Sequence, residues 1–319
     1  MNACQRRVIL TALVLVASGS TGAAQTAKKK GASKPPANAS KGAVLVIVNE
    51  QKITESDLNR LLTTRQVAEE ARDKFRRRFI EDLIDLRLIQ QFLASRKTSA
   101  TKEEIDAEIN RLKAQIKQSG RDPDQVMAET GYTAEALRQE FAVPMAWKRH
   151  VDRAVPASRL KKYFDEHREE FDGTKVRASR ILIKPASGEE EAWKSAEAKL
   201  SALRRRIVER QIAFEDAAGE FSAAPSKEQG GDVGWFQFTG KMPERFSREA
   251  FRLAEGEISE PFRTHYGVEL CEATGRKPGD LSLEDVREDV LARLSQEMWK
   301  ETVAKLRETA KIEWKIEKP

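Results

Sequence analysis

Cysteine and histidine are scarce in this sequence. Its 319 residues contain two cysteines and three histidines, the latter at His150, His167 and His265. So few cysteines exclude a disulfide framework of the kind that holds small secreted folds together. The histidines stand too far apart to form a metal-ligand set. No Ser-His-Asp, Cys-His or clustered-carboxylate arrangement supports a hydrolase, and we expect neither a metal nor a cofactor.

Aromatic residues are also few, and no long run carries charge of one sign. The chain has 57 Lys and Arg against 51 Asp and Glu, and the two signs alternate within the same stretches, as in RRRFIEDLIDLR. A nucleic-acid-binding surface would need a patch of one sign with aromatic side chains for stacking. We therefore expect solvated helix faces and no nucleic-acid partner.

The longest apolar run is too short to cross a membrane as a helix. Residues 8–17, VILTALVLVA, follow two arginines and precede the small residues SGSTGAA, an order typical of a cleaved export signal. A membrane span needs about 20 apolar residues, so an uncleaved anchor is the less favoured interpretation. We expect residues 1–24 to be a signal peptide, no integral membrane segment after cleavage, and a periplasmic or secreted protein.

Cleavage would leave Cys271 as the only thiol, and no cysteine follows the apolar run to carry a lipid. Residues 25–42 are mostly Lys, Ala, Ser and Pro, which cannot bury enough apolar surface to offset the entropy of ordering. We expect this stretch to be a disordered linker. The folded part of the chain would then begin near residue 43.

Residues 43–155 predict a helical module that opens with a hairpin. Ala43–Ile53 has the pattern of two short strands around a turn at Asn49-Glu50, and Thr54 is placed to cap the next helix. Apolar residues three or four positions apart then indicate amphipathic helices, one of them begun by a capping box of Thr101 with Glu104. Such helices could simply form a bundle core, or they could keep an apolar groove open for unfolded clients.

The end of the chain predicts a helix and a strand. Residues 156–173 indicate a connector helix, and Pro278-Gly279 breaks the chain before Ser282 caps a long amphipathic helix. Residues 311–317 alternate apolar and charged side chains, as a half-buried strand does. The predicted partner is the strand at 43–48, so that residues 279–319 complete the N-terminal module and residues 174–278 are inserted in it.

The inserted part is organised around the stretch from Phe221 to Gly267. Its GGDVGWF segment places Gly230, Gly231 and Gly234 where positive φ angles or close backbone approach are needed. Apolar residues follow, among them Met242 and Phe246 four positions apart. This pattern indicates a small hydrophobic pocket for an apolar residue of a polypeptide. The alternative is an ordinary surface turn before a core helix.

The order of these residues closely resembles the parvulin (PpiC-like) family of peptidyl-prolyl cis-trans isomerases. The resemblance covers Val176–Arg276 and rests on F-S-x-x-P-S, G-G-D-x-G-W-F, A-F-x-L-x-x-G-E-I-S-x-P and the glycine of T-x-x-G. The rest of the layout resembles exported chaperones of the SurA type. Together they imply an α+β fold, in which a mainly helical chaperone module carries one parvulin-fold domain, a small antiparallel sheet with helices. They also imply unfolded or nascent exported polypeptides as partners.

A prolyl isomerase must bind a twisted amide better than either planar isomer, and rotation costs roughly 18–20 kcal/mol without help. It needs an apolar pocket for the proline ring and no metal, cofactor or covalent step. The resemblance places this pocket at Val233, Met242 and Phe246. All three side chains are apolar, which predicts an intact pocket.

The polar half of the family's site is replaced. Arg180 and Glu269 stand where the family usually has histidines, and Ala224 stands where it has Cys or Asp; only Thr264 keeps its family identity. We expect Arg180 and Glu269 to face each other across adjacent strands as an ion pair at a partly exposed site. His265 is not expected to replace them. Two hypotheses follow: a folding factor with weak or no turnover, and an active isomerase that relies on pocket binding and desolvation.

Overall fold

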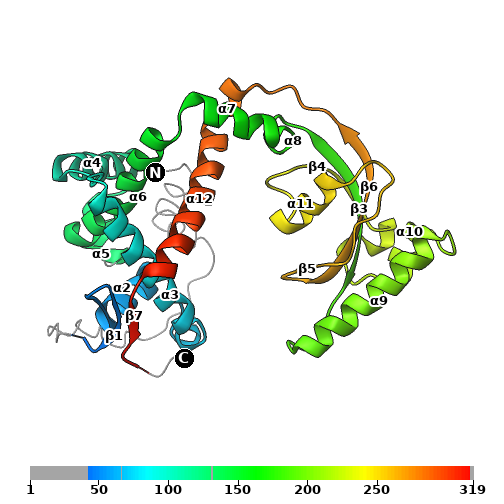
Figure 1. The fold of residues 1–319 in the computed structure, drawn as a ribbon, viewed down its shortest axis with the longest axis horizontal. Coiled ribbons are helices and arrows are strands. Elements are labelled where there is room, and N and C mark those ends of the chain that lie inside the picture. Colours follow the sequence, from blue (N-terminus) through cyan, green and yellow to red (C-terminus); the bar gives the residue numbers. More distant parts are fainter. Residues whose placement is uncertain (1–41, 66, 131, 317–319) are drawn as a thin grey trace. The chain divides into compact units, whose positions relative to one another are not determined.

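The computed structural model describes residues 42–65, 67–130 and 132–316. The predicted signal peptide and all of the predicted linker except Gly42 lie outside these residues. Contacts divide the described chain into two compact units (Figure 1). The first is made of the described parts of Met1–Pro156 and Leu294–Pro319, and the second is the continuous segment Ala157–Arg293. The fold is α+β, mostly helical with small antiparallel sheets, as predicted.

The first unit contains a three-stranded antiparallel sheet in the order β2-β1-β7. Its strands are β1 (Val44–Val48), β2 (Gln51–Thr54) and β7 (Ile312–Trp314). Asn49 and Glu50 form the hairpin turn with φ angles of 46° and 71°, the left-handed conformation that suits the twist of a two-residue hairpin. The predicted pairing of the last strand with the first is confirmed, although β7 is shorter than the predicted 311–317.

Helices pack around this sheet and beside it. They are α2 (Glu55–Thr64), the short 3₁₀ helix η1 (Glu69–Ala71), α3 (Arg72–Ser95), α4 (Lys102–Gln118), α5 (Pro123–Thr130), α6 (Ala134–Ala154) and, from Leu294 onward, α12 (Leu283–Thr309). The predicted caps are confirmed, because Thr54 forms a capping box with Asp57 and Thr101 forms one with Glu104. One hydrophobic core joins the sheet to α2 and α3, and a second joins α4, α5 and α6.

The second unit begins with two helices and continues as a four-stranded antiparallel sheet in the order β4-β3-β6-β5. Its elements are α7 (Ala157–Glu166), α8 (Arg168–Phe171), β3 (Lys175–Ile183), α9 (Glu190–Val208), α10 (Phe214–Phe221), η2 (Pro225–Gln229), β4 (Asp232–Gln237), α11 (Glu244–Arg252), β5 (Phe262–Thr264) and β6 (Gly267–Lys277). The predicted connector helix is therefore interrupted at His167. The start of α12 also belongs here, with Ser282 bonded to Asp285 in the predicted cap.

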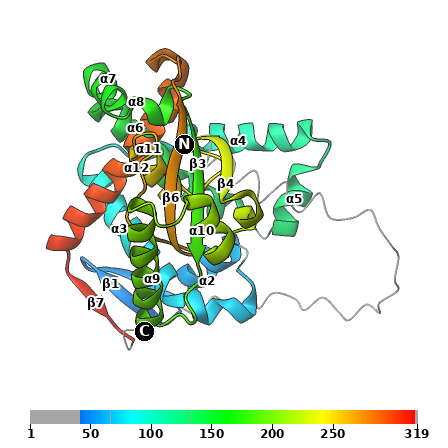
Figure 2. The same ribbon diagram turned by 90° about the vertical axis from the view of Figure 1, so that its right-hand side faces the viewer.

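The two faces of the four-stranded sheet carry separate cores. Helix α11 covers one face, and α9 and α10 cover the other (Figures 1 and 2). Alternation along a strand sends successive side chains to opposite faces. Val176 and Ala178 of β3 and Cys271 and Ala273 of β6 thus share the core under α11. Among the described residues no helix is both long enough and apolar enough to cross a membrane.

Candidate functional site

The glycine loop, residues 230–234, is hydrogen-bonded directly to β3, the strand that contains Arg180. Gly230 ends η2 with a φ angle of 62° and Gly231 follows with 85°. The backbone N–H of Arg180 donates to the Gly231 oxygen at 2.9 Å. A Cβ at Gly231 would lie 2.6 Å from the Arg180 carbonyl oxygen, which no side chain could tolerate without moving the backbone. The predicted need for glycine is confirmed here on both grounds, positive φ and close approach.

The three predicted pocket residues lie together on the α11 face of the sheet. Phe246 is fully buried in this core, and Val233 and Met242 are partly buried against it. The Phe246 ring packs 5.9 Å from Phe236 and 6.0 Å from Phe262, measured between ring centroids. Phe246 is therefore the most deeply buried of the three, and Val233 and Met242 are partly accessible to solvent.

Arg180 and Glu269 form the predicted ion pair, with 3.4 Å between Nε and Oε2. Two parts of that prediction were wrong. The residues are not directly opposite, because Arg180 pairs with Cys271 and Leu182 pairs with Glu269, so the ion pair runs diagonally across β3 and β6. The site is also not partly exposed, since Arg180 is 9% exposed and Glu269 is 0% exposed. The diagonal offset is two residues, which keeps both side chains on the same face of the sheet.

Burial leaves this pair incompletely satisfied. Arg180 Nε and Glu269 Oε2 are buried without a hydrogen-bond partner among the described residues. The other carboxylate oxygen, Oε1, accepts a hydrogen bond from the Thr264 hydroxyl at 2.7 Å. That hydroxyl in turn accepts from the backbone N–H of Tyr266 at 3.2 Å. Thr264 therefore positions Glu269.

The charge state of Glu269 is set by burial more than by its partners. Burial raises the pKa of its carboxyl above the usual value, and the attraction of Arg180 and the hydrogen bond from Thr264 offset this only in part. The Arg180 guanidinium is a cation with hydrogen-bond donors only. The centre consequently combines a fixed cation with a carboxyl that takes up a proton more readily than usual. It lacks the two neutral imidazoles that could pass a hydrogen bond between them.

Arg180 also lies against Phe246. Its guanidinium carbon lies 5.9 Å from the centroid of the Phe246 ring, within the range of a cation–π contact. A charged group beside an apolar patch must be desolvated or displaced before another apolar group can pack there. Arg180 therefore belongs both to the ion pair and to the surroundings of Phe246.

Ala224 is the residue directly before η2. Ala224 is buried and brings no polar side chain. Its backbone N–H donates to Ser222 Oγ at 3.1 Å, and the N–H of Leu182 donates to the same hydroxyl at 3.1 Å. Ser222 thus fastens the segment before η2 to β3. The sequence pattern did not predict this role, although Ser222 belongs to the F-S-x-x-P-S motif.

Two remaining candidates add no catalytic group. Cys271 lies opposite Arg180, but burial raises the pKa of its thiol to about 12, so it supplies no thiolate at neutral pH. His265 is exposed, and its ring lies against Tyr266 at a centroid distance of 3.7 Å. Its charge can only modestly lower the pKa of Glu269. Among the described residues no cluster of His, Cys, Asp and Glu is arranged to hold a metal ion.

Known proteins and protein families resemble this chain, most clearly in the second unit. The profile of the family described as "Rotamase: PPIC-type PPIASE domain" matches residues 181–275. Foldase protein PrsA of Geobacillus kaustophilus is 30% identical over 225 residues, which cover 68% of this chain and 68% of that protein. The chain belongs to the PrsA foldase family.

Other relatives show where the likeness is concentrated. Foldase protein PrsA of Bacillus subtilis is 31% identical over 195 residues, 59% of this chain and 57% of that protein. Chaperone SurA of Xanthomonas oryzae is 33% identical over 147 residues, but these cover only 44% of this chain and 31% of that protein. The likeness thus extends further along the PrsA foldases than along SurA. The chain matches little more than half of the Bacillus subtilis protein's length.

Proposed function

We propose that this PrsA-family protein is an exported folding factor, periplasmic or secreted, that binds unfolded or nascent exported polypeptides. We propose further that its parvulin-like domain turns over prolyl bonds weakly or not at all. The names of its relatives, foldase and chaperone, support the first part. The buried Arg180–Glu269 ion pair supports the second, because the resemblance to parvulins implies histidines at these two positions.

The physical argument concerns what a twisted amide needs. At the midpoint of rotation the prolyl nitrogen becomes a hydrogen-bond acceptor and the carbonyl loses conjugation, so the site must favour that state over both planar isomers. Arg180 and Glu269 form an ion pair with each other at 3.4 Å, which leaves each less able to interact with a substrate. Arg180 also lies 5.9 Å from the Phe246 ring centroid, beside the proposed proline pocket. The centre then serves to hold β3 and β6 together.

A second candidate function is an active prolyl isomerase. It is favoured by one observation: Val233, Met242 and Phe246 gather in a single apolar patch. A pocket that binds the ring and excludes water could lower the barrier without a polar relay. This alternative requires Arg180 to swing off Phe246 when substrate arrives.

Two assays on the same preparation separate these functions. Aggregation of an unfolded client is followed by light scattering with and without the protein, and isomerisation of a prolyl peptide is followed in parallel. We expect suppression of aggregation with little or no acceleration of isomerisation. A turnover rate equal to that of a histidine-bearing parvulin would establish the second candidate. Failure to suppress aggregation would refute the client-binding proposal.

A further inference from the structure

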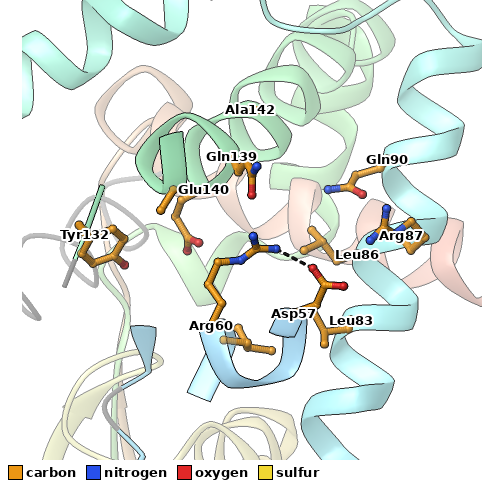
Figure 3. Close-up of a pocket in the computed structure, with 12 residues that line it drawn as sticks. Asp57, Arg60, Leu83, Leu86, Arg87, Gln90, Tyr132, Gln139, Glu140 and Ala142 are labelled. Carbon is orange, nitrogen blue, oxygen red and sulfur yellow. Dashed lines mark hydrogen bonds and ion pairs between the residues drawn. The ribbon is translucent and has the colours of Figure 1, made fainter. Parts of the chain in front are cut away.

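A cavity of about 370 Å³ lies in the first unit (Figure 3). Three helices form its walls: α2, α3 and α6. Its apolar surface comes from Leu61 of α2, Leu83 and Leu86 of α3, and Ala136 of α6. The volume falls at the small end of the roughly 300–1,000 Å³ typical of ligand pockets. It would accept a short segment of chain, with an apolar side chain against the leucines.

Two of the charged residues that line the cavity, Asp57 and Arg60, already have partners within α2 and its cap. Asp57 Oδ2 accepts from the backbone N–H and the hydroxyl of Thr54, at 2.9 and 2.8 Å, in the cap of α2. Its other oxygen pairs with Arg60 Nη2 at 2.9 Å (Figure 3). These two charges neutralise each other and need no ligand.

Three other polar side chains of the cavity have no such partners. Glu140 of α6 and Arg87 and Gln90 of α3 are partly buried in its walls. None of the three makes a hydrogen bond or ion pair with another residue of the described chain. Burial raises the pKa of the Glu140 carboxyl, and the more distant charges of Arg65 and Arg60 oppose this only in part. A desolvated carboxylate without a donor costs stability, so these groups are poor choices for a site that serves the fold alone.

We propose that this cavity binds the main chain of an extended, apolar client segment. Glu140 on one wall would accept hydrogen bonds from its backbone N–H groups. Arg87 and Gln90 on the facing wall would donate hydrogen bonds to its carbonyl oxygens. The proposal rests on the client-binding function proposed above and names the place where that function is carried out.

Charge and shape favour this occupant over others. The four charged lining residues, Asp57, Arg60, Arg87 and Glu140, sum to zero, so an ionic ligand gains no net attraction. A lipid tail would use the leucines but would leave Glu140, Arg87 and Gln90 unsatisfied in a drier cavity. A polypeptide backbone offers donors and acceptors at every residue, whatever its sequence. Such a site would tolerate many client sequences.

The test uses the full chain and a short, uncharged, proline-free peptide of leucine, phenylalanine, serine and asparagine, capped at both ends and labelled for fluorescence anisotropy. The variants are Glu140→Leu, which removes the acceptor, and Ala136→Trp, which fills the cavity. The matched control is Glu135→Leu, the same change at an exposed position of α6. A series of peptides, each methylated at one backbone nitrogen, removes the client's donors one at a time.

We expect Glu140→Leu to weaken binding about tenfold, as loss of a hydrogen bond to a charged group does, and Glu135→Leu to leave binding unchanged. The melting temperature of Glu140→Leu should equal or exceed that of the wild type. Methylation at one or two nitrogens should weaken binding to the wild type but not weaken it further in Glu140→Leu, because both changes remove the same bond.

Equal peptide affinity of Glu140→Leu, Ala136→Trp and wild type would overturn the cavity assignment. The assignment would also be overturned if the wild type binds lauric acid, Ala136→Trp abolishes that binding, and the peptide does not compete with lauric acid. In either case, continued suppression of client aggregation by the wild type would leave the proposed function standing. If the wild type neither binds the peptide nor suppresses client aggregation, the proposed function itself is refuted.

Discussion

The indole Nε1 of Trp147 donates a hydrogen bond to Ser295 Oγ at 3.0 Å, across 148 residues of sequence. Both groups are buried in the first unit, where Trp147 also packs edge-on against Trp299. The second part of α12 is therefore an integral part of the N-terminal core. It is joined there by β7, which pairs with β1.

Removing residues 294–319 should unfold the first unit and leave the second folded. The cut falls after Arg293 because residues before it hold the second unit: the N–H of Leu281 donates to the Asp172 oxygen at 2.9 Å. Thermal melting followed by circular dichroism, with limited proteolysis, measures the outcome. A truncated chain whose N-terminal helices still melt cooperatively would contradict it. The milder change Ser295→Ala should cost about 1–3 kcal/mol, since it leaves a buried N–H unsatisfied.

Arg180→His together with Glu269→His should restore isomerisation. We expect the double variant, with or without Ala224→Cys, to raise the rate by about a hundredfold, near the lower end of what positioned acid–base groups contribute. The measurement is the rate of cis-to-trans conversion of a prolyl peptide. No increase in a double variant that is folded would mean that the pocket itself, in which Phe246 is buried, does not accept a proline ring.

The corresponding single variants should be less stable than the double variant. Each leaves one buried charge without its partner, which costs roughly 3–5 kcal/mol, whereas removing both charges avoids that penalty. Chemical denaturation of all four forms gives the coupling free energy directly. Single variants as stable as the double variant would show that Arg180 and Glu269 do not depend on each other.

Stability should fall as pH rises above about 4.5 because of Glu269. Burial raises its pKa in the folded state above 4.5, the ordinary value of a glutamate side chain. Between these two values the folded protein keeps a proton that the unfolded chain has released, so increasing pH favours unfolding. Glu269→Gln should flatten this part of the profile, while Glu255→Gln at an exposed position should not. The free energy of unfolding measured from pH 4 to 8 decides this, and a profile unaffected by Glu269→Gln would be evidence against it.

Gly231→Ala should destabilise the protein more than Gly256→Ala. Both glycines have φ angles near 85°, which costs a residue with a Cβ about 1–2 kcal/mol. At Gly256 the added Cβ meets nothing within 4 Å, but at Gly231 it meets the Arg180 backbone at 2.6 Å. The difference between the two variants isolates the steric contact. Equal losses would imply that the loop moves away from β3 at little cost.

Local signals in the sequence predicted most of the elements correctly. Thr54, Thr101 and Ser282 mark helix starts because capping chemistry involves residues only three positions apart. The alternation at the chain end likewise predicted β7 and its partner. These features depend on neighbours in the chain or on a simple apolar pattern.

What the sequence could not predict depends on contacts between distant residues. The ladder of β3 with β6 shifts between Arg177 and Ala178, and no local pattern shows which residues of two strands will be paired after such a shift. For the same reason the complete burial of Glu269 was not foreseen. The cavity around Glu140 was also missed, because it needs three helices to be placed before it exists.

The pairing of β7 with β1 affects the order in which the two units fold during synthesis. The N–H of Asn49 donates to the Lys311 oxygen at 3.0 Å, and the N–H of Lys311 donates to Asn49 Oδ1 at 2.9 Å. The edge of β1 is therefore unpaired until the last residues of the chain have been synthesised. The second unit is continuous in sequence and can fold as soon as Arg293 has emerged from the ribosome. The first unit, although its residues emerge earlier, must finish later.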